Sequence, residues 1–217
     1  MRKPITLALI FLAIGIAGGA LAHQPRLVSD RTNIEVEEPE ISKAYYGQLS
    51  DNSVVYQIEA EQPFGLYVNL LVPAIDNAKK DFIIEIRKNG VLLDMLNGRS
   101  YAWTDFYEPY ARDRYFKGPE FKQEVGPGDY EIEIFNADYD GRYVLAIGQE
   151  EKFGIKEIIK TAYILPVIKV VFFDKSPLVS LFNLSGLILV GLILIIFILI
   201  LIIKKILKSA KEKKDES

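Results

Sequence analysis

The sequence contains no cysteine and a single histidine, His23. The absence of cysteine excludes disulfide bridges, thiolate metal sites and thiol nucleophiles, so a folded domain of this chain depends on its apolar core. The sequence also lacks a glycine-rich phosphate loop, a metal-ligand cluster and a recognisable Ser–His or Cys–His arrangement. We therefore expect that the protein is not an enzyme.

Clustered positive charge is lacking in the middle of the chain. Residues 23–182 contain 18 Lys/Arg and 26 Asp/Glu, a net charge of −8, whereas residues 1–22 carry +2 and residues 204–217 carry +3. Binding to nucleic acid depends on clustered Lys/Arg that neutralise phosphates. We therefore expect no nucleic-acid partner.

The longest apolar run covers residues 178–203 and contains no charged residue. A helix needs about 20 apolar residues to cross a bilayer. Lys204, Lys205 and Lys208 follow at once, and a basic flank marks the cytoplasmic side of a membrane. The pattern predicts a transmembrane helix over 178–203 and a basic cytoplasmic tail over 204–217. The protein would then be a single-pass protein of the cell membrane, in contact with its lipid bilayer, with the N-terminal part outside.

Residues 1–22 have the pattern of a secretory signal peptide, since Arg2 and Lys3 precede an apolar run and small residues end at Ala22. The alternative is an uncleaved second membrane anchor. Cleavage after Ala22 would make His23 the first residue, whose amine and ring can together bind Cu(II). A copper site of that type needs a second histidine, and the sequence has none. We therefore expect no copper cofactor.

Alternating apolar and polar residues dominate the region 43–150, which follows a polar, extended lead-in over 23–42. Tyr130, Ile132 and Ile134 alternate with glutamates, as in a strand with one buried face. The dipeptides Asn89-Gly90 and Asp140-Gly141 are typical of tight hairpin turns. The predicted fold class is all-β: an antiparallel β-sandwich of about eight strands, followed by an amphipathic helix and one C-terminal transmembrane helix.

The predicted amphipathic helix covers residues 151–175 and lies next to the expected membrane span. Its apolar residues recur at steps of three and four, and Pro166 predicts a kink. Two interpretations remain open. The helix packs on the sandwich, or it lies in the outer membrane interface with its lysines toward the headgroups.

An irregular stretch over 97–128 is rich in aromatic residues and arginine. Such side chains combine a large contact area with a polar group and are typical of recognition surfaces. The predicted contact patch consists of Tyr101, Trp103, Tyr107, Tyr110, Arg112 and Arg114. Its expected partner is a protein or a glycan. The alternative is that these rings only complete the core at the edge of the sandwich.

The only candidate metal site is the sequence Asn136-x-Asp138-x-Asp140-Gly141, which matches the opening of a calcium loop. The twelfth position of that loop is Ile147 instead of glutamate, so the segment is no EF-hand. A weak Ca²⁺ site remains possible on this spacing. The alternative is an ordinary polar hairpin turn, because Asn, Asp and Gly are the usual turn formers. No other cofactor is expected.

Two families share features with this sequence. The pattern Gly128-Asp129-Tyr130 followed by Gly141-Arg142-Tyr143-Val144-Leu145 resembles the closing strands of bacterial pre-peptidase C-terminal domains. That resemblance implies a small extracellular β-sandwich with a binding or accessory role, sometimes with Ca²⁺. The order of segments is also similar to that of the p24 cargo receptors, although the paired cysteines of that family are missing.

We expect a membrane-anchored binding module of a prokaryotic envelope, placed outside the cytoplasm. Three alternatives remain. They are an envelope polysaccharide hydrolase with an Asp/Glu pair, a cargo receptor similar to the p24 family, and a structural subunit of a membrane complex.

Overall fold

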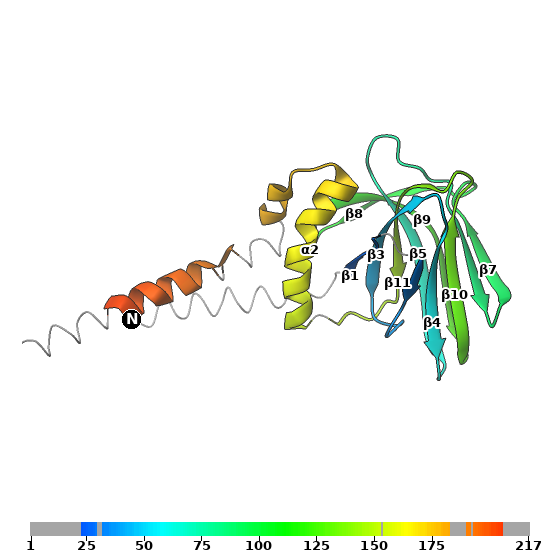
Figure 1. Cartoon of the computed structure of the whole chain (residues 1–217), viewed down its shortest axis with the longest axis horizontal. Helices are drawn as coiled ribbons and strands as arrows, with labels where there is room; N and C mark the ends of the chain where they lie inside the picture. Colours follow the sequence, from blue (N-terminus) through cyan, green and yellow to red (C-terminus); the bar gives the residue numbers. More distant parts are fainter. Residues whose placement is uncertain (1–22, 30–31, 153, 183–189, 192, 206–217) are drawn as a thin grey trace, which may run out of the picture.

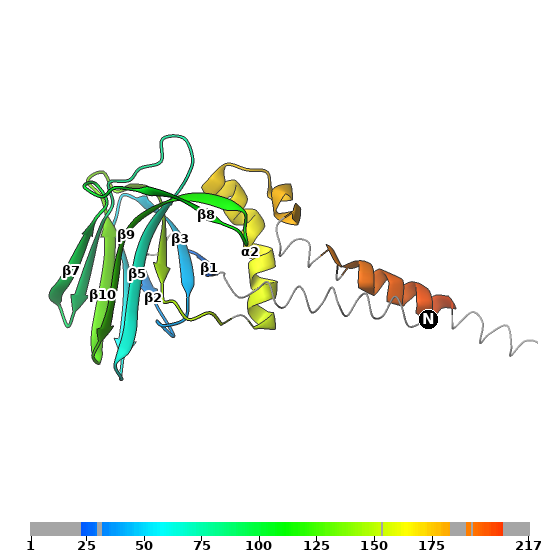
Figure 2. The same ribbon diagram turned by 180° about the vertical axis from the view of Figure 1, so that it is seen from behind.

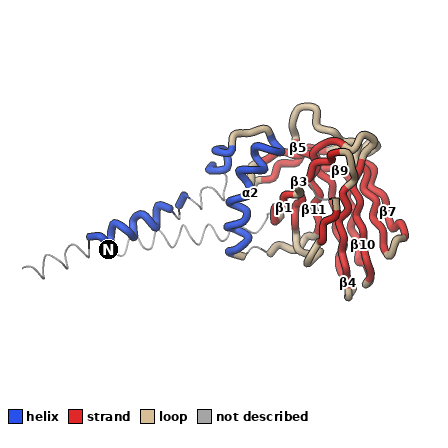
Figure 3. Tube along the Cα trace, viewed as in Figure 1, coloured by secondary structure: helices blue, strands red, loops and turns tan. Residues whose placement is uncertain are grey.

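The computed structural model describes residues 23–29, 32–152, 154–182, 190–191 and 193–205 (Figure 1). They form two stacked β-sheets with one long helix on the outer side of one sheet (Figure 3). The strands in chain order are β1 (Gln24–Leu27), β2 (Asn33–Glu35), β3 (Lys43–Ser50), β4 (Val54–Ala60), β5 (Phe64–Pro73), β6 (Ile83–Lys88), β7 (Val91–Asn97), β8 (Thr104–Glu108), β9 (Asp113–Val125), β10 (Gly128–Phe135) and β11 (Asp140–Ile147). The helices are α2 (Ile155–Phe173) and the short 3-10 helix η1 (Pro177–Phe182).

A six-stranded sheet has the order β1-β3-β11-β5-β9-β8, and a five-stranded sheet has the order β2-β4-β10-β6-β7. Most neighbours are antiparallel, so the predicted sandwich is present, with more strands than the eight expected. The additional strands β1 and β2 come from the segment 23–42, and both pair in parallel at sheet edges. β1 has no alternation, whereas β2 alternates over only a few residues, with Ile34 packed against the main core.

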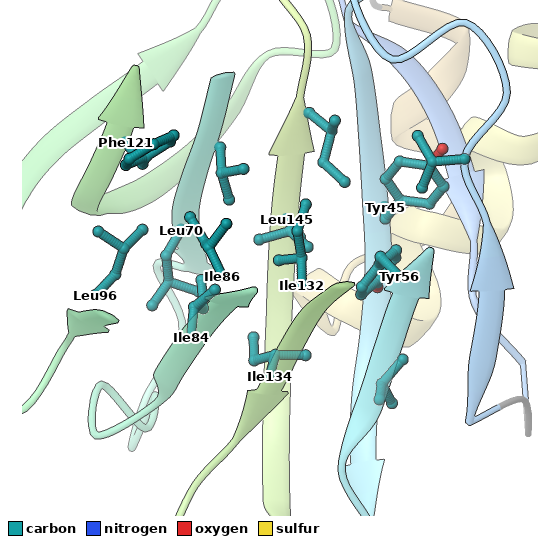
Figure 4. Close-up of a cluster of buried hydrophobic side chains, with 14 of the residues drawn as sticks. Tyr45, Tyr56, Leu70, Ile84, Ile86, Leu96, Phe121, Ile132, Ile134 and Leu145 are labelled. Atoms are coloured by element: carbon teal, nitrogen blue, oxygen red, sulfur yellow. The ribbon is translucent and has the colours of Figure 1, made fainter. Parts of the chain in front are cut away.

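The main core lies between the two sheets. Figure 4 shows side chains from both sheets pointing into this layer. Its members include Tyr45, Tyr56, Leu70, Ile84, Ile86, Leu96, Phe121, Ile132, Ile134 and Leu145. The hydroxyl groups of Tyr56 and Tyr143 lie 2.9 Å apart, so each buried tyrosine finds a polar partner. Gly47 is needed beside them, because the ring of Tyr143 occupies the space of a Cβ at that position.

The predicted turns also form. Asn89 and Gly90 both have positive φ values, 49° and 77°, in the hairpin that joins β6 and β7. These values are those of a two-residue turn that follows the twist of its strands. The turn decides where β7 lies, at the edge of the five-stranded sheet.

The predicted transmembrane helix over 178–203 is contradicted, and the fold class is corrected accordingly. No helix within the described residues is both long and apolar enough to cross a membrane. The first residues of the predicted span form η1 instead of an α-helix, and residues 190–191 and 193–205 are helical. An apolar sequence gives the length available for a crossing, but a crossing also requires a helix of about 20 residues.

Three predictions fall wholly or partly outside the described residues. The predicted signal peptide over 1–22 lies outside them. So do residues 183–189 and 192 of the apolar run, and residues 206–217 of the predicted tail.

The helix α2 packs on the outer face of the six-stranded sheet (Figures 1 and 2). Adjacent residues of a strand point to opposite faces, so Tyr45 enters the main core and Tyr46 meets the helix. The sheet is therefore buried on both faces, and its central strands β5 and β11 contain unbroken runs of buried residues. The second core contains Ala44, Tyr46, Leu71, Tyr110, Tyr115, Val144, Ala146, Leu165, Ile168, Phe172 and Phe173.

A buried ion pair joins α2 to the sheet. The side chains of Lys169 and Asp113 are both 0% exposed, and Lys169 Nζ lies 2.5 Å from Asp113 Oδ2. Lys169 Nζ also donates to the carbonyl oxygen of Ala111, and Lys175 Nζ lies 3.1 Å from the second carboxylate oxygen of Asp113. Burial lowers the pKa of Lys169, and the carboxylate of Asp113 opposes that shift.

The substitution Lys169→Met is expected to lower the free energy of unfolding by about 3 kcal/mol or more, because the buried carboxyl group of Asp113 loses its buried partner and keeps only the partly exposed Lys175. Chemical unfolding followed by circular dichroism measures this change. The matched control is Lys152→Met, since Lys152 pairs with Glu38 where both side chains are more than 60% exposed. This control is expected to stay near the wild-type value. Equal losses in the two variants would contradict the structural role of the buried pair.

Candidate functional site

The structure separates the six residues of the predicted contact patch into two groups. Trp103 lies in the connection from β7 to β8 and is partly buried against the main core. Its Nε1 donates to the carbonyl oxygen of Gly98 at 2.8 Å, and its ring lies close over Gly98 and Gly118. Trp103 therefore anchors this connection to the sandwich and contributes to its shape.

Tyr101, Tyr107 and Arg114 form the exposed part of the predicted patch. The tyrosines are 43% and 47% exposed. Tyr101 meets the ring of Trp103 edge-on, with centroids 6.5 Å apart. Tyr107 on β8 and Arg114 on β9 are direct cross-strand partners, with the guanidinium 5.9 Å from the ring centroid. We call Tyr101, Trp103, Tyr107 and Arg114 the aromatic ledge.

Tyr110 and Arg112 lie in the turn between β8 and β9 and contact the C-terminal helices. Tyr110 is 8% exposed and belongs to the core beneath α2. Arg112 has a positive φ of 59° in the turn between β8 and β9, and its Nη1 donates to the carbonyl oxygen of Phe182 at 3.0 Å. These two residues hold the turn against the C-terminal helices, and the same turn joins Tyr107 on β8 to Arg114 on β9.

The strand β7 carries an exposed apolar surface that the sequence analysis did not identify. Val91, Leu92, Leu93 and Met95 are 70%, 48%, 38% and 49% exposed. β7 pairs with β6 on one side and is the last strand of its sheet, so its other backbone edge has no strand partner within the described residues. Natural proteins usually protect such edges with charge or proline, because a free apolar edge invites pairing with another chain.

A signal for this surface was present in the sequence. Val91-Leu92-Leu93 has three consecutive apolar residues directly after the Asn89-Gly90 turn, where alternation would leave one face polar. Such a run fits a strand buried on both faces or one that presents apolar residues to a partner. Only the sheet order separates these possibilities, because it places β7 at an edge.

The segment Asn136–Asp140 forms a turn in which Lys79 takes part. The ammonium of Lys79 lies 2.5 Å from Asp138 Oδ2 and 2.9 Å from Asp140 Oδ2, and these contacts raise its pKa. Asn136 is buried and closes the turn through hydrogen bonds with the backbone of Asp140. The described residues include no group of three or more His, Cys, Asp or Glu that could hold a metal ion. The Ca²⁺ site at Asn136, Asp138 and Asp140 stays a prediction.

A small cavity of about 30 Å³ lies between α2 and the six-stranded sheet. Its lining includes His23, Tyr46, Glu108, Tyr115 and Thr161. The carboxylate of Glu108 accepts hydrogen bonds from the backbone N–H groups of Tyr110 and Ala111. Burial nevertheless raises the pKa of Glu108, because desolvation outweighs these bonds. His23 contacts the Ser42 hydroxyl, and burial lowers its pKa.

A groove of about 720 Å³ lies between β1, β2 and the start of α2. It contains several carboxylates. A hydrolase would need two of them, one as the general acid and one as the general base. Glu157 receives both Nη atoms of Arg26, at 2.9 and 3.2 Å, and Glu38 pairs with Lys152. These carboxylates hold the N-terminal segment and the helix together, so the geometry assigns them a structural role.

Comparisons with known proteins give distant structural similarity only. No protein-family model and no curated protein sequence matches the chain. Among solved structures, the chain is similar to the pre-peptidase C-terminal domain of collagenase from Bacillus anthracis, with 11% identity over 58% of this chain and 96% of that chain and a TM-score of 0.33. The resemblance to this domain family predicted from the sequence is thereby confirmed as a distant likeness.

Two further structures show similarity of the same kind. The first is CorA, a surface-associated copper-binding protein of Methylomicrobium album BG8, with 9% identity over 58% of this chain and all of that chain and a TM-score of 0.30. The second is the CBM36-1 domain of a xylanase from the hindgut metagenome of Trinervitermes trinervoides, with 17% identity over 49% of this chain and 77% of that chain and a TM-score of 0.24.

The substitution Trp103→Ala is expected to lower the free energy of unfolding by about 3 kcal/mol, because it leaves a void over Gly98 and Gly118. Tyr101→Ala removes a ring that is 43% exposed and is expected to change the same quantity by less than about 1 kcal/mol. Urea unfolding of both variants measures the difference. Equal effects would show that Trp103 does not anchor the connection.

Glu108 is expected to make stability depend on pH. Its folded-state pKa lies above the unfolded value, so its contribution is complete below the ordinary glutamate range and is lost as the pH rises through the folded pKa. The free energy of unfolding of the wild-type protein then falls over this range, by at most about 1.4 kcal/mol per pH unit for one proton. Urea titrations across this range for Glu108→Gln are expected to show a shallower fall.

The control for this measurement is Glu61→Gln, which replaces an exposed carboxylate. It is expected to keep the wild-type pH dependence. An unchanged slope in Glu108→Gln would show that the carboxyl group does not titrate in a buried environment.

Proposed function

We propose that the β-sandwich is a non-catalytic binding module that accepts an extended polypeptide along β7. The observation that carries this proposal is the free edge of β7 together with its four exposed apolar side chains. Backbone hydrogen bonds along an edge strand supply affinity for an extended peptide, and its alternate side chains supply specificity.

The aromatic ledge supports the same function because it follows β7 in the chain. The connection that carries Tyr101 and Trp103 leaves the end of β7 and enters β8 in the other sheet. β7 also contacts β9, the strand on which Gly118 lies beneath the Trp103 ring. A peptide bound along β7 would continue toward the aromatic ledge. Aromatic side chains with a polar group, together with an arginine, are common in recognition surfaces.

We place this interaction outside the cytoplasm. The support is the signal-peptide pattern over 1–22 and the acidic, cysteine-free composition of the domain that follows.

The substitution Met95→Lys tests the proposed use of β7. A lysine on an edge strand opposes pairing with another strand, and Met95 is 49% exposed, so the fold should tolerate the change. Peptides selected from a random display library on the full-length protein serve as probes. Fluorescence anisotropy is expected to show that Met95→Lys binds the selected peptides at least about tenfold more weakly than the wild-type protein.

The matched control is Val167→Lys, which places the same side chain at a 40% exposed apolar position on α2. It is expected to bind the peptides like the wild-type protein. Amide hydrogen exchange on the wild-type complex is expected to slow within β7. Peptides that bind Met95→Lys at full strength, or that protect only other strands, would contradict the proposal.

A further inference from the structure

The helix α2 is apolar on two opposite sides. Thr161, Leu165, Ile168 and Phe172 follow one another at steps of four and three and are buried against the sheet. Ile159, Tyr163, Val167 and Val170 have the same kind of spacing and are 66%, 81%, 40% and 47% exposed. The second series begins two residues before the first, which at 3.6 residues per turn places it on the far side of the helix. We call this second series, with Val171, the outward stripe.

Each residue of the outward stripe is 40% or more exposed. A helix that buries only one side usually has a polar far side, and apolar residues all round indicate contact on both sides. The next element, η1, also exposes apolar side chains: Leu178, Val179 and Phe182 are 64%, 40% and 66% exposed. η1 packs beside α2 and lies on its side away from the sandwich (Figures 1 and 2).

Two exposed lysines border the outward stripe. Lys156 and Lys160 form no hydrogen bond or ion pair with any described residue, although the chain is acidic between residues 23 and 182. The one acidic residue of α2, Glu157, is already engaged by Arg26. The helix therefore presents apolar side chains together with two lysines that form no ion pair, although the groove that they line also contains Glu35, Glu37 and Glu38.

We propose that the outward stripe and η1 lie flat on an anionic lipid surface, with Lys156 and Lys160 at the headgroups. This combination is typical of helices that bind in the plane of a membrane interface. A second copy of the chain is the other candidate for covering the stripe. It would bring Lys156 and Lys160 of both copies to one interface, and α2 offers no free carboxylate to match them there.

The proposed contact requires no membrane crossing by α2 or η1 and does not rest on the binding function of β7. It also fixes an orientation. β7 lies at the end of the molecule farthest from α2 in both views of the ribbon, so the lipid-bound protein would present β7 away from the membrane (Figures 1 and 2).

The absence of cysteine allows a direct test on the full-length protein. Tyr163→Cys carries an environment-sensitive dye in the outward stripe, and Val91→Cys carries it on β7, where Val91 is 70% exposed. The proteins are mixed with vesicles of phosphatidylcholine and phosphatidylglycerol in equal parts that contain a headgroup nitroxide quencher. The dye at position 163 is expected to lose most of its emission to the lipid quencher, while the dye at position 91 keeps it.

The lysines are tested by Lys156→Gln/Lys160→Gln in the Tyr163→Cys background. Each lysine removed is expected to raise the lipid concentration for half-maximal quenching about fivefold, the equivalent of about 1 kcal/mol per basic residue near an anionic surface. Vesicles of phosphatidylcholine alone are expected to show no such difference between the two proteins.

Two outcomes would overturn the proposal. In the first, a dye at Leu199→Cys is quenched by the lipid nitroxide while the dye at position 163 stays accessible to aqueous iodide, so that only the C-terminal residues meet lipid. In the second, pyrene at position 163 gives excimer emission that lipid does not abolish, which would assign the stripe to a second copy.

Discussion

The buried ion pair between Asp113 and Lys169 is the interaction on which the arrangement of this molecule depends. Both side chains are fully buried, and removing two charges from water is costly unless their geometry and hydrogen bonds compensate. The compensation comes from three elements, because Lys169 lies on α2, Asp113 begins β9, and Lys175 adds a second ammonium from the segment after the helix. An apolar contact between the helix and the sheet would tolerate sliding. A paired charge does not, so the ion pair fixes the register of α2 on the sheet.

The register of α2 determines which of its residues face the sheet and which face away from the sandwich. The helix turns Leu165, Ile168 and Phe172 toward the sheet, and the outward stripe then faces away from the sandwich. One face of the six-stranded sheet is covered by α2 and the other by the second sheet, so the free surface of the β-domain consists of the outer face of the five-stranded sheet, the loops and the strand edges. The exposed apolar residues of β7 lie at one of those edges. The two apolar surfaces therefore lie at opposite ends of one rigid core.

The sequence predicts local features of this fold well and non-local ones poorly. Alternation around Ile132 and the Asn89-Gly90 pair identify strands and a turn, because those signals depend on neighbouring residues alone. The sequence did not predict the parallel edge strands β1 and β2, because they form only by pairing with β3 and β4 farther along the chain. The site shows the same limit. Tyr107 and Tyr110 are three residues apart, yet one is exposed on β8 and the other lies under α2. An apolar run likewise reports length and not secondary structure, and no helix within the described residues is long and apolar enough for the predicted span.

The position of Lys169 near the end of the domain has a consequence for biosynthesis. Every strand of both sheets precedes residue 148, so the sandwich can close on itself while the helix is still inside the ribosome or the translocation channel. Until the helix follows, Tyr46, Tyr115 and Val144 face water, and the carboxylate of Asp113 lacks its counter-charge. At this stage the nascent chain has a packed core between its sheets and an exposed apolar surface on one sheet. Chaperones bind folding intermediates of this kind.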